Sequence, residues 1–272
     1  MQIYRTTLLI FGATAFAAGV CQGYGGNALL VDGSDLPGAE FTAALRSDGG
    51  EGAACSTGAG VAFQQELRQR GLLPEQNGTW PHLPAVHPVI CKCIYQSGAR
   101  CLFRTAVLSV QQATDGWRVR VFTTGGLCEI LAQALLDTTS CGVAQPLLGA
   151  RQPEIEALSL NAEILAKNSV YSMELGCFSI FPAVRENEGY LRFALPPGTT
   201  CAQAHEMLYQ AWRRRGDTLA DYRISYAAPV LDILPAAPEG ERHWIPSVRF
   251  GNVVRAFDAG VQYAQQKEVQ GR

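Results

Sequence analysis

The stretch "TTLLIFGATAFAAGVCQGYGGNALLVDG", residues 6–33, decides the fold of this chain, and its first half has two interpretations. The first is a secretory signal peptide. Arg5 lies in a short leading region, "LLIFGATAFAAGV" is an apolar core of suitable length, and Ala15-Phe16-Ala17 fits the small-x-small pattern of a cleavage site. This interpretation predicts an exported protein that loses about its first 17 residues.

The second interpretation is a βαβ unit, and it accounts for the whole stretch. "TTLLIF" is a continuous apolar run of strand length, which is typical of a parallel strand buried on both faces. Gly12 ends this run, and "ATAFAAGVCQGY" has the small residues of a helix packed closely against a sheet. Gly25-Gly26 ends the helix, and "NALLVD" is a second apolar strand. A signal peptide gives no reason for that second strand, so we favour the βαβ unit.

The spacing of Gly12 and Asp32 indicates a dinucleotide site. Asp32 follows Gly12 by 20 residues, where a carboxylate reaches the ribose of a bound dinucleotide. The glycine fingerprint G-x-G-x-x-G is incomplete, because Thr14 replaces the glycine that lets the backbone approach the pyrophosphate. The Thr14 hydroxyl could instead donate to a phosphate at the helix N-terminus. The predicted cofactor-binding residues of this unit are Gly12, Ala13, Thr14, Ala15, Phe16 and Asp32.

The composition is that of an ordinary globular protein. The chain has 272 residues, 47% of them apolar and 17% charged, with a net charge of −2, so nothing indicates a nucleic-acid partner. No run approaches the about 18 consecutive apolar residues of a membrane span. The nine cysteines are odd in number and irregularly spaced, which favours a reducing compartment and hence the cytoplasm.

The rest of the chain alternates between helix and strand patterns. A glycine-rich loop is expected at 46–62, then a helix within 61–73 and another from Pro88 to about Gly98. "CLFRTAVLSVQQA" (101–113) and "WRVRVFTT" (117–124) alternate like paired strands, and a further strand ends at Asp137. Later, 190–212 predicts strand, turn and helix, and "YRISYAAPVLDIL" (222–234) predicts one strand.

Three minor features complete the pattern. Asn77-Gly78-Thr79 is a glycosylation sequon that has meaning only if the chain is exported. His205 and His243 are candidate bases near a cofactor, although a structural role is the default for each. The segment "HLPAVHPVICKC" contains four candidate metal ligands, His82, His87, Cys91 and Cys93. A metal site there is disfavoured, because the two cysteines are two residues apart and would point to different sides of a helix.

Two segments after the βαβ unit carry a family resemblance. "VLSVQQATDGWRVRVFTTGGLCEILAQALLDTTS" (107–140) and "WIPSVRFGNVVRAFDAGVQYAQQ" (244–266) follow in the order seen in FAD-dependent oxidoreductases with the glutathione-reductase-type FAD domain. The chain resembles this family over about 1–45, 86–142 and 243–268.

The resemblance implies FAD as the cofactor and adds further site residues. The "DTTS" turn that begins at Asp137 corresponds to the "DATG" turn beside the FAD pyrophosphate, with Ser140 in place of glycine. Ala106 or Val107 would lie near the adenine, and the glycine turn before the last helix would face the flavin. The site residues implied in this way are Val107, Thr138, Thr139, Gly251 and Asn252.

We therefore predict an α/β protein with a Rossmann-like FAD/NAD(P)-binding domain and a small α+β cap or substrate domain. The first would comprise 1–149 and 236–272, and the inserted cap would comprise 150–235. Because this cap is short, a partner subunit or a second copy would cover the flavin.

The predicted function is an FAD-dependent oxidoreductase acting on an unidentified small molecule. The alternative is a structural or regulatory relative without tight FAD binding, because Thr14 and Ser140 fill glycine positions. An exported binding protein is the third possibility.

Overall fold

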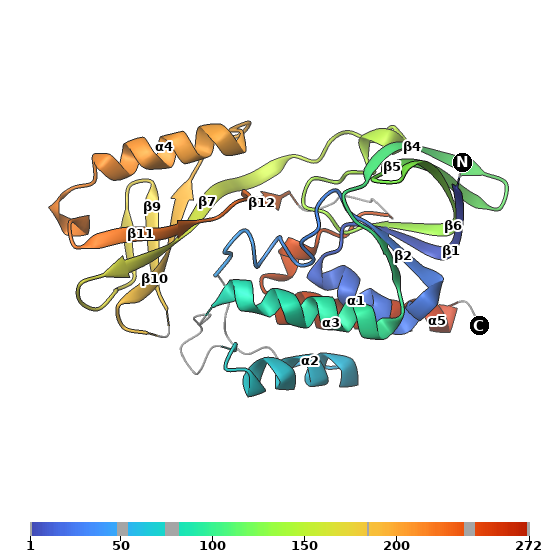
Figure 1. Cartoon of the computed structure of the whole chain (residues 1–272), viewed down its shortest axis with the longest axis horizontal. Coiled ribbons are helices and arrows are strands. Elements are labelled where there is room, and N and C mark those ends of the chain that lie inside the picture. Colours follow the sequence, from blue (N-terminus) through green and yellow to red (C-terminus); the bar gives the residue numbers. More distant parts are fainter. Residues whose placement is uncertain (1, 48–53, 74–81, 184, 237–242, 271–272) are drawn as a thin grey trace.

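The computed structural model describes residues 2–47, 54–73, 82–183, 185–236 and 243–270, which form two β-sheets and the helices around them (Figure 1). Sheet A has the order β3-β2-β1-β6-β5-β4, and sheet B has the order β11-β7-β10-β9-β8, with β12 also paired to β7. The strands of sheet A are β1 (Gln2–Phe11), β2 (Ala28–Val31), β3 (Arg100–Leu102), β4 (Ala106–Ala113), β5 (Gly116–Thr123) and β6 (Gly126–Asp137).

The predicted βαβ unit is present, and its two strands are inner strands of sheet A. The last residues of β1 pair in parallel with β2, and Ile10 lies opposite Leu30. Helix α1 (Ala15–Tyr24) connects the two strands and ends at Gly25, whose φ of 54° belongs to the left-handed region. Residues 6–17, which resemble a signal peptide, are thus part of the central strand and its helix.

Strand β6 joins two parts of sheet A. It runs parallel to β1 from Cys128, opposite Gln2, to Asp137, opposite Phe11. On its other side it pairs with β5 in an antiparallel arrangement that β4 continues. This agrees with the predicted parallel sheet that carries inserted antiparallel strands.

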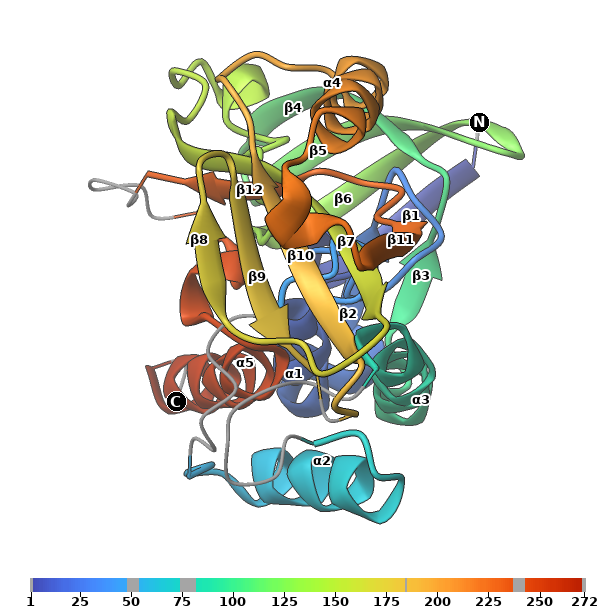
Figure 2. The ribbon, with the colours of Figure 1, turned by 90° about the vertical axis from the view of Figure 1, so that its left-hand side faces the viewer.

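Helices α1, α3 (His87–Ser97) and α5 (Val253–Gln270) lie on one face of sheet A, with α2 (Gly58–Gln69) beyond them (Figures 1 and 2). Helices α1 and α5 approach very closely at two glycines. A Cβ atom on Gly19 would lie 2.0 Å from the carbonyl oxygen of Phe257, and one on Gly260 would lie 2.1 Å from that of Phe16. Only glycine allows this crossing.

Sheet B forms the second half of the molecule, and α4 (Cys201–Arg213) covers it (Figure 1). One cluster of buried apolar side chains extends from α1 to this sheet and includes Phe16, Phe41 and Leu160. The strands of sheet B are β7 (Ile155–Ala166), β8 (Met173–Leu175), β9 (Phe178–Pro182), β10 (Glu188–Ala194), β11 (Tyr222–Ala227) and β12 (Asp232–Pro235).

Three sequence-based element predictions need correction. Residues 222–234 form two strands, β11 and β12, because the chain turns at Pro229, which cannot donate to a ladder. Residues 101–113 also divide: Cys101 and Leu102 belong to the parallel edge strand β3, and the chain turns at Arg104, with a φ of 50°. The loop predicted for 46–62 is shorter, because α2 begins at Gly58 behind its cap Thr57.

Two further observations concern the compartment. No helix of the described residues is long and apolar enough to cross a membrane. The sequon Asn77-Gly78-Thr79 lies outside the described residues.

Candidate cofactor-binding site

The candidate site lies where β1 ends and α1 begins. Gly12 has a φ of 89°, which favours glycine. A Cβ atom there would lie 2.7 Å from Cγ2 of Thr139 and 3.1 Å from Oγ1 of Thr138. The turn after β6, with Thr138 and Thr139, therefore packs directly against the turn after β1.

Thr138 fastens these two turns together. Its hydroxyl lies 3.0 Å from the carbonyl oxygen of Phe11 and 3.1 Å from that of Gly12, to which it donates. The fully buried Asp137 closes the turn from the other side, because its carboxylate accepts hydrogen bonds from Thr139 and from the N–H of Ala144.

Thr14 is the N-cap of helix α1. Its oxygen accepts a hydrogen bond from the N–H of Ala17 at 3.1 Å, and its hydroxyl donates to Oγ1 of Thr138 at 2.8 Å. From the sequence, we expected the Thr14 hydroxyl to donate to a phosphate. In this conformation its proton is directed to Thr138 instead.

Asp32 lies at the end of β2, facing the glycine turn. Its Oδ2 accepts from the N–H of Ala13 at 2.6 Å, and its Oδ1 accepts from the N–H of Ser34 at 2.6 Å. The predicted ribose ligand is thus adjacent to the turn, and its carboxylate holds the backbone of that turn.

Two side chains that were not predicted from the sequence, Glu40 and Ser247, accept hydrogen bonds from the first turn of α1. Oε1 of Glu40 accepts from the N–H of Ala15 at 2.8 Å and from the hydroxyl of Ser247 at 2.7 Å. The Ser247 hydroxyl accepts in turn from the N–H of Phe16 at 3.2 Å. Desolvation by burial raises the pKa of Glu40 to about 7, although these hydrogen bonds act in the opposite direction.

Glu40 reaches this position because its loop is anchored to sheet B. Arg46 forms a buried ion pair of 2.8 Å with Asp232 of β12, and the Asn161 amide donates to the carbonyl oxygen of Ala44 at 2.8 Å. The only sequence signal for Glu40 is an isolated acid within the apolar segment "GAEFTAAL". Ser247 carries no distinctive signal.

The C-terminal segment completes the site. The N–H of Ser247 donates to the carbonyl oxygen of Thr138 at 3.0 Å, which places residues 243–250 beside the end of β6. The ring of Phe250 stacks on that of Phe16, with centroids 5.0 Å apart. Gly251 has a φ of 82°, and Oδ1 of Asn252 caps helix α5 by accepting from the N–H groups of Val254 and Arg255.

Val107 is not part of the glycine turn. It belongs to β4 and packs against the buried cluster that contains Phe11 and Val31. Just before this strand, the N–H of Thr105 donates to the carbonyl oxygen of Asp32 at 2.9 Å, which ties the start of β4 to the end of β2.

The histidines considered from the sequence lie in separate places. His82 faces Glu163 of sheet B at 3.3 Å, whereas His87 contacts Cys91 one turn along α3. His205 bonds to the carbonyl oxygen of Cys201, and His243 meets the ring of Trp117 edge-on. Within the described residues, no three His, Cys, Asp or Glu side chains gather as metal ligands would.

The chemistry of the donors at α1 fits an anion. A helix N-terminus with a glycine turn is a site at which phosphate groups bind in nucleotide-binding folds. Here the carboxylate of Glu40 accepts the hydrogen bond from the N–H of Ala15 that a phosphate group would otherwise accept. A pyrophosphate would fit these donors in place of Glu40, but not beside it, because like charges would meet.

Comparison with known proteins places this geometry in context. No protein-family model matches the chain. No curated protein matches its sequence. Among solved structures, p-nitrophenol 4-monooxygenase from Pseudomonas putida is 12% identical with a TM-score of 0.60, covering 97% of this chain and 78% of that one. A geranylgeranyl bacteriochlorophyll reductase-like protein from Thermoplasma acidophilum is 11% identical with a TM-score of 0.63, covering 99% and 80%.

A third structure contains the cofactor itself. The complex of aklavinone-11 hydroxylase with FAD and aklavinone is 13% identical with a TM-score of 0.53, covering 99% of this chain and 62% of the hydroxylase. Identities this low establish the fold alone. The chain therefore has the Rossmann-like FAD-binding fold of flavin-dependent oxidoreductases, with a second, antiparallel sheet.

Proposed function

We propose that this protein is an FAD-dependent oxidoreductase that acts on a small molecule. The observation that carries the proposal is the first turn of α1, whose Ala15 N–H already donates to the carboxyl group of Glu40 beside the end of β1. The fold shared with flavin-dependent enzymes supports the same assignment.

In this proposal the pyrophosphate of FAD takes the place of the Glu40 carboxylate. The N–H groups of Ala15 and Phe16 would hold it, and Asp32 would bind the adenosine ribose. When bound, FAD supplies the electron-transfer chemistry, and the chain binds and orients its partners. The proposed cofactor-binding residues are Gly12, Ala13, Thr14, Ala15, Phe16, Asp32, Val107, Thr138, Thr139, Gly251 and Asn252.

We further propose that residues 150–235 form the substrate domain. Sheet B and α4 lie in this segment, and the ion pair between Arg46 and Asp232 connects it to the loop that carries Glu40. Since the segment is short, we propose that a second copy or a partner subunit covers the flavin.

The hydrogen bonding of Glu40 also favours a second candidate function. A relative that has lost tight FAD binding would keep the fold and fill the anion site with its own carboxylate, as Glu40 does. Such a protein would serve as a structural or regulatory subunit.

The absorbance spectrum and intact mass of the purified full-length protein separate these functions. The first predicts a flavin band in the blue, either as purified or after addition of FAD. A colourless protein that ignores added FAD supports the second. Loss of about the first 17 residues on expression would instead support the exported protein, and this cleavage would remove the whole of β1.

Thr14→Gly tests the placement of the pyrophosphate. Glycine at an N-cap costs only a few tenths of a kcal/mol relative to threonine, so the helix should remain formed. We expect tighter FAD binding, because the variant removes the branched side chain beside Gly12. Unchanged affinity would show that Thr14 does not face the pyrophosphate.

A further inference from the structure

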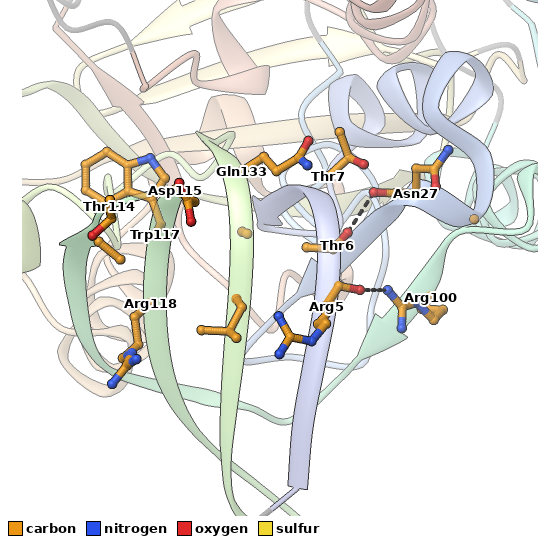
Figure 3. Close-up of a pocket in the computed structure, with 14 residues that line it drawn as sticks. Arg5, Thr6, Thr7, Asn27, Arg100, Thr114, Asp115, Trp117, Arg118 and Gln133 are labelled. Carbon is orange, nitrogen blue, oxygen red and sulfur yellow. Dashed lines mark hydrogen bonds between the residues drawn. The ribbon is translucent and has the colours of Figure 1, made fainter.

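A second polar cavity lies on sheet A, remote from the glycine turn. It has a volume of about 630 Å³ and is formed by the first half of β1, the neighbouring parts of β5 and β6, and the turn between β4 and β5 (Figure 3). Gly12 lies seven positions after Arg5 of this cavity, which is about 23 Å of extended strand.

Two arginines flank the floor of the cavity on the same face of the sheet. Arg5 of β1 lies opposite Leu131 of β6, and Leu131 lies opposite Arg118 of β5. Residues directly opposite one another share a face, and two strand spacings place the two arginine Cα atoms about 10 Å apart. Figure 3 shows the Arg5 guanidinium directed toward β6, with Arg118 on the far side of that strand.

The charges of this cavity are poorly neutralised. Within the described residues, the Arg5 guanidinium has neither a hydrogen bond nor an ion pair, and Arg118 reaches Glu129 only at 3.9 Å. A third arginine, Arg100, donates to the backbone oxygen of Arg5. Against these three cations the lining contains one acid, Asp115. Some arginines elsewhere have close acidic partners, as Arg46 has in Asp232.

We propose that this cavity binds a phosphorylated small molecule, whose phosphate group lies between Arg5 and Arg118 above Leu131. Guanidinium groups match the oxygens of a phosphate by paired hydrogen bonds, and two of them neutralise its charge. The cavity is larger than a phosphate group. Leu131 provides apolar surface for the organic part of the ligand.

Calorimetric titration with phenyl phosphate tests this site, with phenol as the uncharged comparison. We expect the full-length protein to bind phenyl phosphate and not phenol, and salt to weaken the binding. Arg5→Gln and Arg118→Gln should each weaken it about tenfold or more, because each removes hydrogen bonds between charged groups.

Arg120→Gln is the matched control. Arg120 lies on β5 two residues from Arg118, on the same face and also exposed, but it does not line the cavity. We expect its affinity for phenyl phosphate to change less than about twofold. Melting temperatures without ligand should stay near the wild-type value in all three variants, because these side chains are exposed.

Two results would overturn the proposal. One is a wild-type protein that binds phenyl phosphate no better than phenol. The other is an equal loss of affinity in Arg120→Gln and Arg118→Gln, which would mean that the charge of the whole face attracts the anion. Neither result depends on whether FAD binds, so this inference and the proposed function can fail separately.

Discussion

Oε1 of Glu40 accepts a hydrogen bond of 2.8 Å from the backbone N–H of Ala15, at the first turn of the first helix. The carboxylate comes from the loop after β2 and occupies the place where nucleotide-binding folds hold a phosphate. A dinucleotide and Glu40 would therefore compete for the same donors, and several measurable consequences follow from this competition.

Removing the charge of Glu40 should strengthen FAD binding. We expect Glu40→Gln to lower the Kd for FAD about fivefold or more, since a like charge at contact distance costs about 1 kcal/mol even at the dielectric constant of water. Quenching of flavin fluorescence during titration measures this affinity. Glu186→Gln, which changes an exposed acid in the turn between β9 and β10, serves as the control and should leave the Kd unchanged.

Weaker FAD binding in Glu40→Gln would contradict the competition and would make Glu40 a supporting residue of the site. Absence of FAD binding in both the wild type and the variant would contradict the proposed function itself.

The stability of the protein should depend on pH through Glu40. Its pKa is about 7 in the folded protein and about 4.3 in an unfolded chain, so the folded state holds more protons between these values. The contribution of Glu40 to stability is therefore complete below the unfolded value and is lost as the pH rises through about 7. We expect the free energy of unfolding of the wild type, relative to Glu40→Gln, to fall from about pH 5 to about pH 8. Urea unfolding at each pH measures it, and a flat difference would contradict the burial of the carboxyl.

Asp258 should be a major contributor to stability. Its carboxylate accepts from the N–H and hydroxyl groups of Ser56 and Thr57 and from the Gln262 amide, which fastens the start of α2 to α5. We expect Asp258→Ala to lower the free energy of unfolding by about 2–4 kcal/mol, because several donors lose a charged partner. Asp221→Ala removes an exposed ion pair with Lys167 and should cost less than about 1 kcal/mol.

The hydrogen bonds of Asp258 should also make the stability of the protein depend on pH in the acid range. Burial alone would raise the pKa of Asp258, but the hydrogen bonds from Ser56, Thr57 and Gln262 lower it below its usual range. Its contribution is thus present at neutral pH and lost as the pH falls through the lowered pKa. Equal acid sensitivity of the wild type and Asp258→Ala would contradict this role.

The crossing of α1 and α5 should tolerate no side chain. In Gly19→Ala the new Cβ would lie 2.0 Å from the carbonyl oxygen of Phe257, so the helices must separate. We expect a loss of about 1–3 kcal/mol, which thermal unfolding would measure. Gly33→Ala is the matched control, because nothing lies within 4 Å of its added Cβ. A Gly19→Ala variant as stable as Gly33→Ala would mean that the helices are further apart.

The local parts of this fold were predictable from the sequence. An unbroken apolar strand, a glycine at its end and a helix of small residues leave few alternatives for β1 and α1, because each signal lies within a few residues. The pairing of β4 with β5 was equally local, since only Thr114 and Asp115 separate the two strands.

The occupant of the anion site was not predictable. Whether Glu40 turns toward Ala15 depends on how its loop is anchored, and that anchor joins Arg46 to Asp232 across 186 positions. The same holds for Ser247, which meets Phe16 across 231 positions. No periodicity within either segment encodes such a contact, which forms only when both halves of the chain pack.

Because α1 and α5 cross closely at Gly19 and Gly260, α1 can reach its final packing only after α5 has been synthesised. The first helix leaves the ribosome early, but its closest partner is the last helix of the chain, 241 positions later. Until α5 has been synthesised, the apolar surface of residues 15–21 has no partner helix at this crossing, and such surface is prone to aggregate. The part of α5 from Phe257 to Ala264 therefore completes the core, and a chain truncated before it would leave the apolar face of α1 uncovered.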